Sequence, residues 1–395
     1  MSEVTNIHYL TNERFPAFTA CSMQQMRMCE AFAACGARIR LVRPLFFDTR
    51  KNSTDDLFDF YAVAQRFPVV TMPSLLAWSK RPTAAKPSRW RVPAVGGLGQ
   101  VIGSAVYLLQ QKSDLPFCLY TRNLHAAWAG LQIKKHTRRR FAIFFEAHNR
   151  VHRPERWFGP VLRSCDGVIT ITKALADYLG DRYGLESDRL CVAPDAVTPR
   201  QVIPVEMARR HLALPETRTH WVVYTGSLLP GKGVDVLVQA AADLPVSTVV
   251  IAGGNPAEIV ELEKRVAGAA DVRFLGWVST GDIWNIQCAA DVLVLPNSDH
   301  PNNAFTSPLK LYEYLQSGRP VVLSDLPVFR EAMPEMANLA WAQAGDPQDL
   351  ARAIRTLAEP DENEQRSNNV VLPPTWNDRA DQILQFIRRR SPYAG

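Results

Sequence analysis

The sequence predicts an α/β protein with two Rossmann-like domains, each built on a parallel β-sheet. Its 395 residues suit about two domains of roughly 100–200 residues each. Short apolar runs rich in β-branched residues alternate with amphipathic helical patterns, which is typical of parallel sheets covered by helices on both faces. A proline-rich segment without apolar periodicity, residues 194–204, divides the chain near its middle.

The alternation is clearest in the second half of the chain, where apolar residues recur at steps of three and four between the predicted strands. These strands are Trp221–Gly226, Thr248–Gly253, Val272–Gly276, Asp291–Pro296, Val321–Asp325 and Leu339–Ala342. The predicted helices between and after them are Val234–Ala242, Pro256–Ala267, Asp282–Ala290, Pro308–Ser317 and Pro347–Ala358.

The first half follows the same pattern less regularly. Its predicted strands are Asn6–Leu10, Arg38–Val42, Phe117–Tyr120, Phe141–Phe145 and Gly167–Ile171. A long helix over Ala20–Cys35 should end at Gly36, because glycine adopts the left-handed conformation that closes many helices. Residues 46–93 are rich in proline, tryptophan and basic residues, and we expect them to form an irregular surface excursion.

These elements predict domains over residues 1–198 and 199–375, with their sheets facing each other across a cleft. Residues 376–395 contain an amphipathic helix, Trp376–Arg390, which we expect to return to the first domain. Its apolar face carries Ala380, Ile383, Leu384 and Ile387.

The net charge of +6 is unevenly distributed along the chain. Residues 1–198 hold 27 basic and 16 acidic residues, whereas the remainder holds 18 and 23. Basic runs at 80–91, 134–140 and 388–390 can be solvated surface, but with Leu75, Leu76, Trp78 and Trp90 they also suit an anionic membrane surface. Nucleic acid is the competing partner, and we do not expect it, since no recognition module is present.

The cysteines and the N-terminus point to a cytoplasmic protein. Seven scattered cysteines without a CxxC pair support neither a disulfide framework nor a zinc site, and the first residues lack the pattern of a secretory signal. Residues 92–111 are uncharged but interrupted by glycines and Pro93, so we do not expect a spanning helix. Gly97, Gly99 and Gly103 imitate a dinucleotide fingerprint with the wrong spacing and no preceding strand.

Two helix starts in the second half are candidates for binding phosphate. Residues 226–233 (GSLLPGKG) match the GxxxxGK loop, but Gly233 replaces the Ser or Thr that would hold Mg²⁺, which disfavours a nucleoside triphosphatase. Free backbone amides and Lys232 could still bind an anion, and the alternative is a simple turn with a solvated lysine.

Residues 306–313 (TSPLKLYE) form the second helix start, after the strand DVLVLP. Thr306 or Ser307 can cap this helix, Pro308 suits its first turn, and Lys310 adds positive charge there. Glu313 can accept hydrogen bonds from two vicinal ribose hydroxyls, or it can be an ordinary solvated carboxylate.

His148 follows the apolar strand FAIFFEA, at an edge where parallel sheets bind ligands. A histidine after such a strand is often structural, but its position favours a role in a site, with Glu146 and Asn149 beside it.

These segments, in this order, resemble the retaining glycosyltransferases of family 4. The donor-binding signature lies in residues 305–325 (FTSPLKLYEYLQSGRPVVLSD), and the resemblance extends to QQMRMCEAFAACGARIRLV, FFEAHN, GSLLPGKG, VRFLGWV and WNDRA. It implies the two-domain GT-B fold, with the acceptor on domain 1–198 and the nucleotide sugar on domain 199–375.

The resemblance also implies roles for individual residues. His148, Lys232 and Glu313 would be catalytic. The donor diphosphate would be bound by Gly226, Ser227, Lys232, Ser307, Leu309 and Lys310, and the ribose and base by Glu313, Leu275, Gly276 and Trp277. The donor sugar or acceptor would meet Glu146, Asn149, Arg122, Asn303 and Phe305. Phe305 and Ser227 stand where the family usually has a carboxylate and an arginine, and we hypothesise that Lys310 replaces the arginine's charge.

The expected function is retaining transfer of a sugar from a nucleotide-diphosphate sugar to a glycan or lipid-linked glycan, in surface polysaccharide or glycolipid assembly. No D-x-D triplet occurs, so we expect no metal and no cofactor beyond the nucleotide sugar. We expect the protein to be peripheral at the inner face of the cell membrane. The alternatives are a nucleotide-sugar epimerase or hydrolase of the same fold, and a non-catalytic subunit of a glycan-assembly complex.

Overall fold

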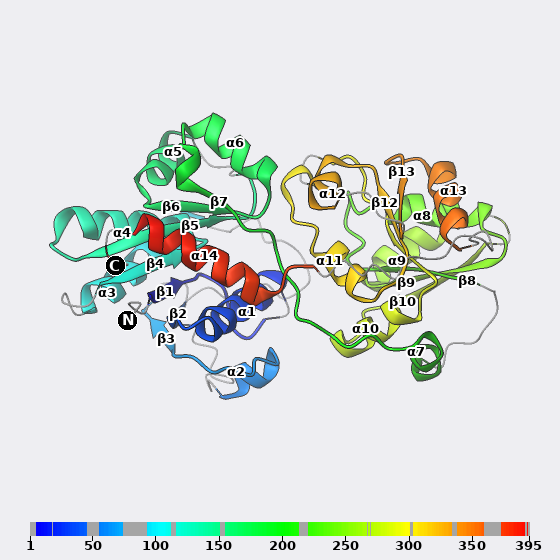
Figure 1. The fold of residues 1–395 in the computed structure, drawn as a ribbon, viewed down its shortest axis with the longest axis horizontal. Coiled ribbons are helices and arrows are strands. Elements are labelled where there is room, and N and C mark those ends of the chain that lie inside the picture. The colour runs from blue at the N-terminus through cyan, green and yellow to red at the C-terminus, as the bar shows by residue number, and fades with distance from the viewer. Residues whose placement is uncertain are drawn as a thin grey trace. The chain divides into compact units, whose positions relative to one another are not determined.

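A computed structural model describes residues 5–17, 19–45, 55–73, 93–111, 116–150, 155–212, 220–266, 268, 270–300, 303–333, 338–358, 373–391 and 393. The chain divides into two compact units (Figure 1). The first consists of Met1–Pro194 together with Trp376–Gly395, and the second is Asp195–Thr375. The division thus falls at Pro194, slightly before the predicted boundary at residue 198, and the terminal helix belongs to the first unit.

The first unit contains a parallel sheet in the order β3-β2-β1-β4-β5-β6-β7. Its strands are β1 (Asn6–Leu10), β2 (Arg38–Pro44), β3 (Val69–Met72), β4 (Phe117–Thr121), β5 (Phe141–Ala147), β6 (Gly167–Thr170) and β7 (Leu190–Val192). Its helices are α1 (Ala20–Ala34), α2 (Asp55–Phe60), α3 (Pro93–Gln110), α4 (Leu124–His136), α5 (Glu155–Ser164), α6 (Lys173–Tyr183) and α14 (Trp376–Arg390).

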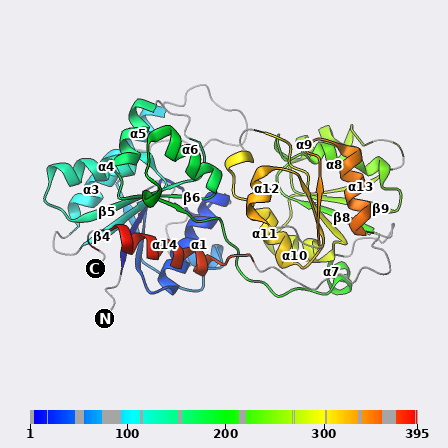
Figure 2. The same ribbon diagram turned by 45° about the horizontal axis from the view of Figure 1, so that its top comes forward.

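Helices cover both faces of this sheet. Helices α1 and α14 pack together on one face, and α3, α4, α5 and α6 form a continuous layer on the other (Figure 2). Strands β4, β5 and β6 are buried along their whole length, as expected of a parallel sheet between two helical layers. Gly36 has a φ of +83° directly after the C-cap of α1, which confirms the predicted end of that helix.

The second unit contains a parallel sheet in the order β10-β9-β8-β11-β12-β13. Its strands are β8 (His220–Thr225), β9 (Ser247–Ala252), β10 (Asp271–Gly276), β11 (Val292–Leu295), β12 (Val321–Ser324) and β13 (Leu339–Ala342). Its helices are α7 (Val205–Leu212), α8 (Val234–Ala240), α9 (Pro256–Glu263), α10 (Thr280–Ala289), α11 (Leu309–Gln316), α12 (Pro327–Ala332) and α13 (Pro347–Ala358). A separate apolar core lies on each face of the sheet.

The elements predicted for the second half are confirmed to within a few residues, as are the five strands, the first helix and the terminal helix of the first unit. The prediction missed β3 and β7 and made no assignment for α4, α5 or α6. The expected excursion over residues 46–93 is wrong in part, because it contains α2 and β3. Leu75, Leu76, Trp78, Trp90 and the basic run 80–91 lie outside the described residues.

The uncharged glycine-rich segment is helix α3, and two of its glycines, Gly97 and Gly103, allow close packing. A Cβ on Gly103 would lie 2.2 Å from the carbonyl oxygen of Pro73, and one on Gly97 would lie 2.5 Å from the His125 ring. Among the described residues, no helix has the length and apolarity needed to cross a membrane.

Candidate functional site

In the second unit, glycines terminate three neighbouring strands at the carboxyl edge of the sheet. Gly226 follows β8 and donates a hydrogen bond to Ala252, and Gly253 follows β9 and donates to Gly276 at 2.7 Å. A Cβ on Gly253, whose φ is +129°, would lie 1.8 Å from the carbonyl oxygen of Gly226. At these three positions the edge therefore presents backbone without a side chain, as close approach of a ligand requires.

Lys232 lies in the loop after β8, which joins this edge to α8. Its side chain is half-buried and makes no hydrogen bond or ion pair with the residues that the structure describes. Burial lowers the pKa of Lys232, and the positive charge of Lys310 lowers it further. Two ammonium groups that repel each other at one sheet edge favour the binding of an anion between them. A bound diphosphate would offset both the repulsion and the loss of hydration that burial imposes on Lys232.

The side chain of Asn303 holds the loop that carries Lys232 in place. Its buried side-chain amide donates hydrogen bonds to the carbonyl oxygens of Gly231 and Ser298, each at 2.8 Å. We expected Asn303 to contact the donor sugar or the acceptor, but the structure gives its amide nitrogen to the backbone. Its observed role is therefore to hold the loop that carries Lys232.

Gly233 shows why the loop departs from the metal-holding motif. Its φ is +67°, and a Cβ there would lie 1.7 Å from the carbonyl oxygen of Pro296. A serine or threonine at this position would force the backbone at Pro296 to shift. The loop packs against β11 only because position 233 has no side chain.

Gly233→Ala should therefore destabilise the second unit by about 2–5 kcal/mol, the sum of left-handed strain and a backbone clash. Gly318→Ala is the matched control, because Gly318 has a φ of +68° and a Cβ added there would have nothing within 4 Å. Urea unfolding of both variants separates the two costs. Equal shifts in midpoint would show that the contact with Pro296 costs nothing.

Helix α11 places Lys310 and Glu313 beside this loop. Lys310 Nζ lies 2.7 Å from Glu313 Oε2, and both side chains are partly exposed. The helix is pinned to the end of β8 by the buried Tyr314, whose hydroxyl accepts a hydrogen bond from the Thr225 backbone amide at 2.8 Å. The arrangement keeps a carboxylate and an ammonium group together where strand β8 ends.

The start of α11 differs from the expectation. The N-cap is Pro308 and no side chain caps the helix. Ser307 is buried and its hydroxyl accepts a hydrogen bond from the Asp195 amide at 3.0 Å, while the amide of Leu309 donates to the Ser307 carbonyl. Both residues were expected to bind the diphosphate. In this structure the Ser307 hydroxyl and the Leu309 amide are instead hydrogen-bonded to backbone groups.

The remaining predicted donor residues lie at the same edge or near it. Gly276 ends β10 with a φ of +64°, and Trp277 follows it with a side chain that is 75% exposed, as a stacking surface for a base would be. Leu275 is partly buried against the core, Ser227 is exposed, and Phe305 is half-buried in the short 3₁₀ helix η4 (Asn303–Phe305).

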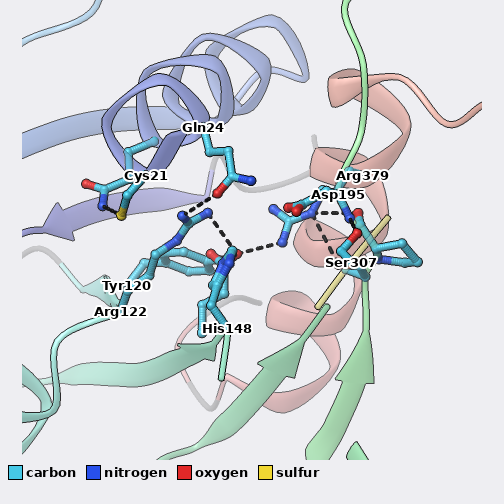
Figure 3. A network of polar contacts seen from close by, with 12 residues as sticks. Cys21, Gln24, Tyr120, Arg122, His148, Asp195, Ser307 and Arg379 are labelled. Atoms are coloured by element: carbon cyan, nitrogen blue, oxygen red, sulfur yellow. Dashed lines mark hydrogen bonds and ion pairs between the residues drawn. The ribbon is translucent and has the colours of Figure 1, made fainter. Parts of the chain in front are cut away.

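In the first unit, a network of polar contacts surrounds Glu146, near the end of β5. Its partners Tyr120, Arg122, His148 and Arg379 are labelled in Figure 3. Glu146 Oε1 accepts hydrogen bonds from Arg122 at 3.0 Å, Arg379 at 2.6 Å and His148 Nε2 at 2.7 Å. Tyr120 donates to Oε2 at 2.5 Å. Burial alone would raise the pKa of Glu146, but the charges of Arg122 and Arg379, together with the hydrogen bond from His148, outweigh it and hold that pKa well below its usual range.

This geometry revises the expected role of Glu146. The carboxylate is fully buried and receives four donors, so it orients neighbouring side chains rather than binding a sugar. Arg122 is also occupied, since its second terminal nitrogen donates to Gln24 on α1 at 3.1 Å. His148 remains partly exposed at 21% of its side chain, and Asn149 is exposed beside it.

Arg379 was not predicted as part of any site. Arg379 lies next to Ala380, on the predicted apolar face of the terminal helix. A charged residue on an apolar face was the one feature of the sequence that could have indicated a buried polar contact. Its guanidinium is buried and also donates to the carbonyl oxygens of Ala193 and Pro194.

Among the described residues, no group of three or more His, Cys, Asp or Glu side chains is placed so that it could bind a metal ion. All seven cysteines are free. Burial raises the pKa of Cys165 and Cys118 to about 12.

The sequence of the second unit is similar to known glycosyltransferases. Residues 219–360 match the family Glycosyl transferases group 1. The D-inositol 3-phosphate glycosyltransferase of Salinispora arenicola is 29% identical over 220 residues, which cover 50% of this chain and 48% of that protein. The mannosylfructose-phosphate synthase of Agrobacterium fabrum is 25% identical over 255 residues, covering 58% of this chain and 54% of that protein. The chain thus matches about half the length of these curated relatives.

Solved structures share the fold over nearly the whole chain. Anabaena HepE in complex with UDP and glucose superposes with a TM-score of 0.67 at 16% identity, covering 96% of this chain and 98% of that one. A sucrose-phosphate synthase from Thermosynechococcus elongatus gives a TM-score of 0.72 at 19% identity and covers 98% of both chains. The chain therefore matches the glycosyl transferases group 1 over residues 219–360, and as a whole it has the two-domain GT-B fold.

Proposed function

We propose that this protein transfers a sugar from a nucleotide-diphosphate sugar to a hydroxyl of a glycan or lipid-linked glycan. Lys232 is the observation that carries this proposal. It is a half-buried ammonium group without a partner among the described residues, in a loop fixed by Asn303 and Gly233, next to a second ammonium group on α11. Such a site fits an anion with two phosphates, and the family match over residues 219–360 supports a sugar nucleotide as its source.

Each part of the nucleotide has a counterpart in the second unit. Glu313 would accept hydrogen bonds from the two ribose hydroxyls, exchanging part of its contact with Lys310 for them. Lys232 and Lys310 would hold the diphosphate. The base would lie against the backbone of Gly276 and the exposed indole of Trp277. HepE, which shares this fold, has been solved with UDP and glucose.

In the proposed reaction the bond from the anomeric carbon to the diphosphate oxygen breaks, and the acceptor oxygen bonds that carbon from the same face. The acceptor's proton passes to the departing phosphate, so the configuration is retained and no metal is needed. Lys232 and Lys310 stabilise the negative charge that develops on the leaving group. We assign to His148 a contact with the donor sugar, as the family resemblance implies.

A nucleotide panel tests this function. Of UDP, GDP, ADP and CMP, one diphosphate should raise the melting temperature, and the corresponding nucleotide sugar should release it in the presence of a glycan or membrane extract. Release of free sugar alone would indicate a hydrolase, and interconversion of the sugar an epimerase. Binding of none of the four nucleotides would contradict the proposal.

Glu313→Gln should weaken binding of that nucleotide by about 10- to 100-fold, because hydrogen bonds to a charged group contribute about 1.5–3 kcal/mol. Calorimetry with the 2′-deoxy nucleotide is the control. Removing the 2′-hydroxyl should cost affinity in the wild type and almost none in Glu313→Gln. Equal costs in both proteins would show that Glu313 does not contact the ribose.

We also propose that the acceptor is reached at an anionic membrane surface. The support lies on the α4–α5 side of the first unit, where a groove of about 400 Å³ is lined by Trp128, Trp157, Lys134 and Lys135 among others. Exposed basic side chains continue beyond α4 at Arg138 and Arg140, and exposed leucine and isoleucine side chains occur on the neighbouring α3.

Vesicle flotation tests this surface. Wild-type protein should float with phosphatidylglycerol-containing vesicles and not with pure phosphatidylcholine. Lys135→Glu with Arg138→Glu should reduce binding at least about tenfold, because each basic residue near such a surface contributes about 1 kcal/mol. Arg210→Glu with Lys264→Glu makes the same charge change on the second unit and should float normally. Equal losses in the two double variants would mean that net charge alone matters.

A further inference from the structure

Arg379 connects two features of the first unit that are far apart in the sequence. The residue lies in the first turn of α14, and only 2% of it is exposed. Its Nη2 donates to Glu146 Oε1 at 2.6 Å, and its Nε donates to the carbonyl oxygens of Pro194 at 2.9 Å and Ala193 at 3.2 Å. Figure 3 shows the guanidinium extending toward His148 and Arg122, which donate to the same oxygen of Glu146.

The contact with Glu146 bears directly on His148. An ionised carboxylate only accepts hydrogen bonds, so His148 Nε2 must carry the proton in the 2.7 Å contact with Glu146 Oε1. Tyr120 and Arg122 hold the same carboxylate from other sides. The position of Glu146 therefore fixes both the tautomer and the ring orientation of His148, and Arg379 is one of the groups that set that position.

The contacts with Ala193 and Pro194 lie at the point where the chain leaves the first unit. Pro194 is the last residue before the chain enters the second unit, and Trp376, three residues before Arg379, is the first after it returns. One side chain thus joins the outgoing chain, the returning helix and the carboxylate that orients His148.

Stability alone is a weak reason to bury this guanidinium. Replacing buried ion pairs with apolar side chains of similar volume is often neutral or stabilising, because desolvation offsets the attraction between the charges. The hydrogen bonds from Arg379 to Glu146, Ala193 and Pro194 have fixed directions, which apolar packing would not provide. Such directional contacts suit a group that must hold another in one orientation.

We propose that Arg379 is a positioning residue, which holds His148 through Glu146 in a fixed relation to the chain at Ala193–Pro194. It touches no substrate in this assignment and acts only through Glu146. The kinetic part of the inference rests on the proposed function, whereas the orientation of His148 does not.

Arg379→Lys and Arg379→Met test the proposal, with Gln385→Met as a control from the exposed side of the same helix. A lysine keeps the charge but cannot reach Glu146 and both carbonyl oxygens at once. For the nucleotide sugar that the panel identifies, Arg379→Lys should lower kcat about tenfold and Arg379→Met more. Nucleotide affinity should be unchanged in both, because the nucleotide contacts lie in the second unit. Gln385→Met should match the wild type.

A spectroscopic readout makes the proposal independent of activity. In ¹⁵N-histidine NMR, with signals identified by His148→Gln, wild-type His148 should be a single Nε2–H tautomer, and Arg379→Lys should show a mixture or a shifted signal. If both variants keep the wild-type tautomer and kcat, the proposal is wrong, whatever happens to the melting temperature. If the wild type binds no nucleotide, the proposed function fails while the NMR comparison still decides the role of Arg379. Should Arg379→Met not fold, the lysine variant alone decides it.

Discussion

Replacing Lys232 with alanine should lower turnover of the nucleotide sugar by about 10²- to 10³-fold, the loss typical of removing one group that stabilises a developing oxyanion. The structure holds this ammonium group in a half-buried position without a partner among the described residues, so it is available to a leaving diphosphate. Lys264→Ala is the control, because Lys264 is an exposed lysine of the same unit, paired with Glu261. Initial rates of nucleotide release measure both variants. Full activity of Lys232→Ala would remove Lys232 from the site.

The pH dependence of the wild type gives a second readout of Lys232. Burial and the charge of Lys310 lower the pKa of Lys232, so its proton is lost at lower pH than that of an ordinary lysine. The alkaline limb of kcat/KM, which reports the free enzyme, should therefore lie below the usual lysine range. Lys310→Gln removes one of the two repelling charges and should move that limb to higher pH. An unmoved limb would mean that another group titrates there.

Glu146→Gln should destabilise the first unit by about 3–5 kcal/mol, because it removes the counter-charge that faces two buried guanidinium groups. Arg122 and Arg379 both donate to the same carboxylate oxygen, at 3.0 Å and 2.6 Å. Urea unfolding monitored in the first unit should show the loss at neutral pH. Glu261→Gln removes an exposed carboxylate from an ion pair with Lys264 and should leave the midpoint unchanged.

Acid should reduce the difference between wild type and Glu146→Gln. The folded-state pKa of Glu146 is held well below the ordinary value of about 4.3, so its stabilisation is complete above that ordinary value. It is lost progressively as the pH falls from about 4.3 towards the folded pKa. The two proteins should therefore converge in stability at acid pH. A difference that stays constant down to pH ~2 would show that charge is not the cause.

The fold could be predicted from the sequence because periodicity reports burial directly. Strands such as β8 and β9 are buried on both faces, and their apolar runs are hard to mistake. Strand β3 was missed because only its last residue, Met72, is buried, so its sequence carries little of that signal. The match over residues 219–360 confirms the family resemblance that the loop and helix motifs of the second half suggested.

The candidate site was only partly predictable, because a motif identifies positions without saying what each atom contacts. Residues 226–233 and 306–313 do lie at one sheet edge, as their places after β8 and β11 required. The sequence could not show that the amide nitrogen of Asn303 bonds the loop backbone or that Ser307 bonds Asp195. Arg379 escaped prediction because its partners, Glu146 and Pro194, lie about 200 residues away in the chain.

The first unit is built from two separate segments of the chain, and this reverses the usual order of folding during synthesis. Domains generally fold as they emerge from the ribosome, beginning at the N-terminus. Here residues 195–375 form the second unit from one continuous stretch, whereas the first unit needs α14 to cover the face it shares with α1. The part of the protein made first is therefore the last to be completed. Until residues 376–390 have been translated, Glu146 lacks Arg379, and the nascent first unit exposes the apolar surface that α14 later covers.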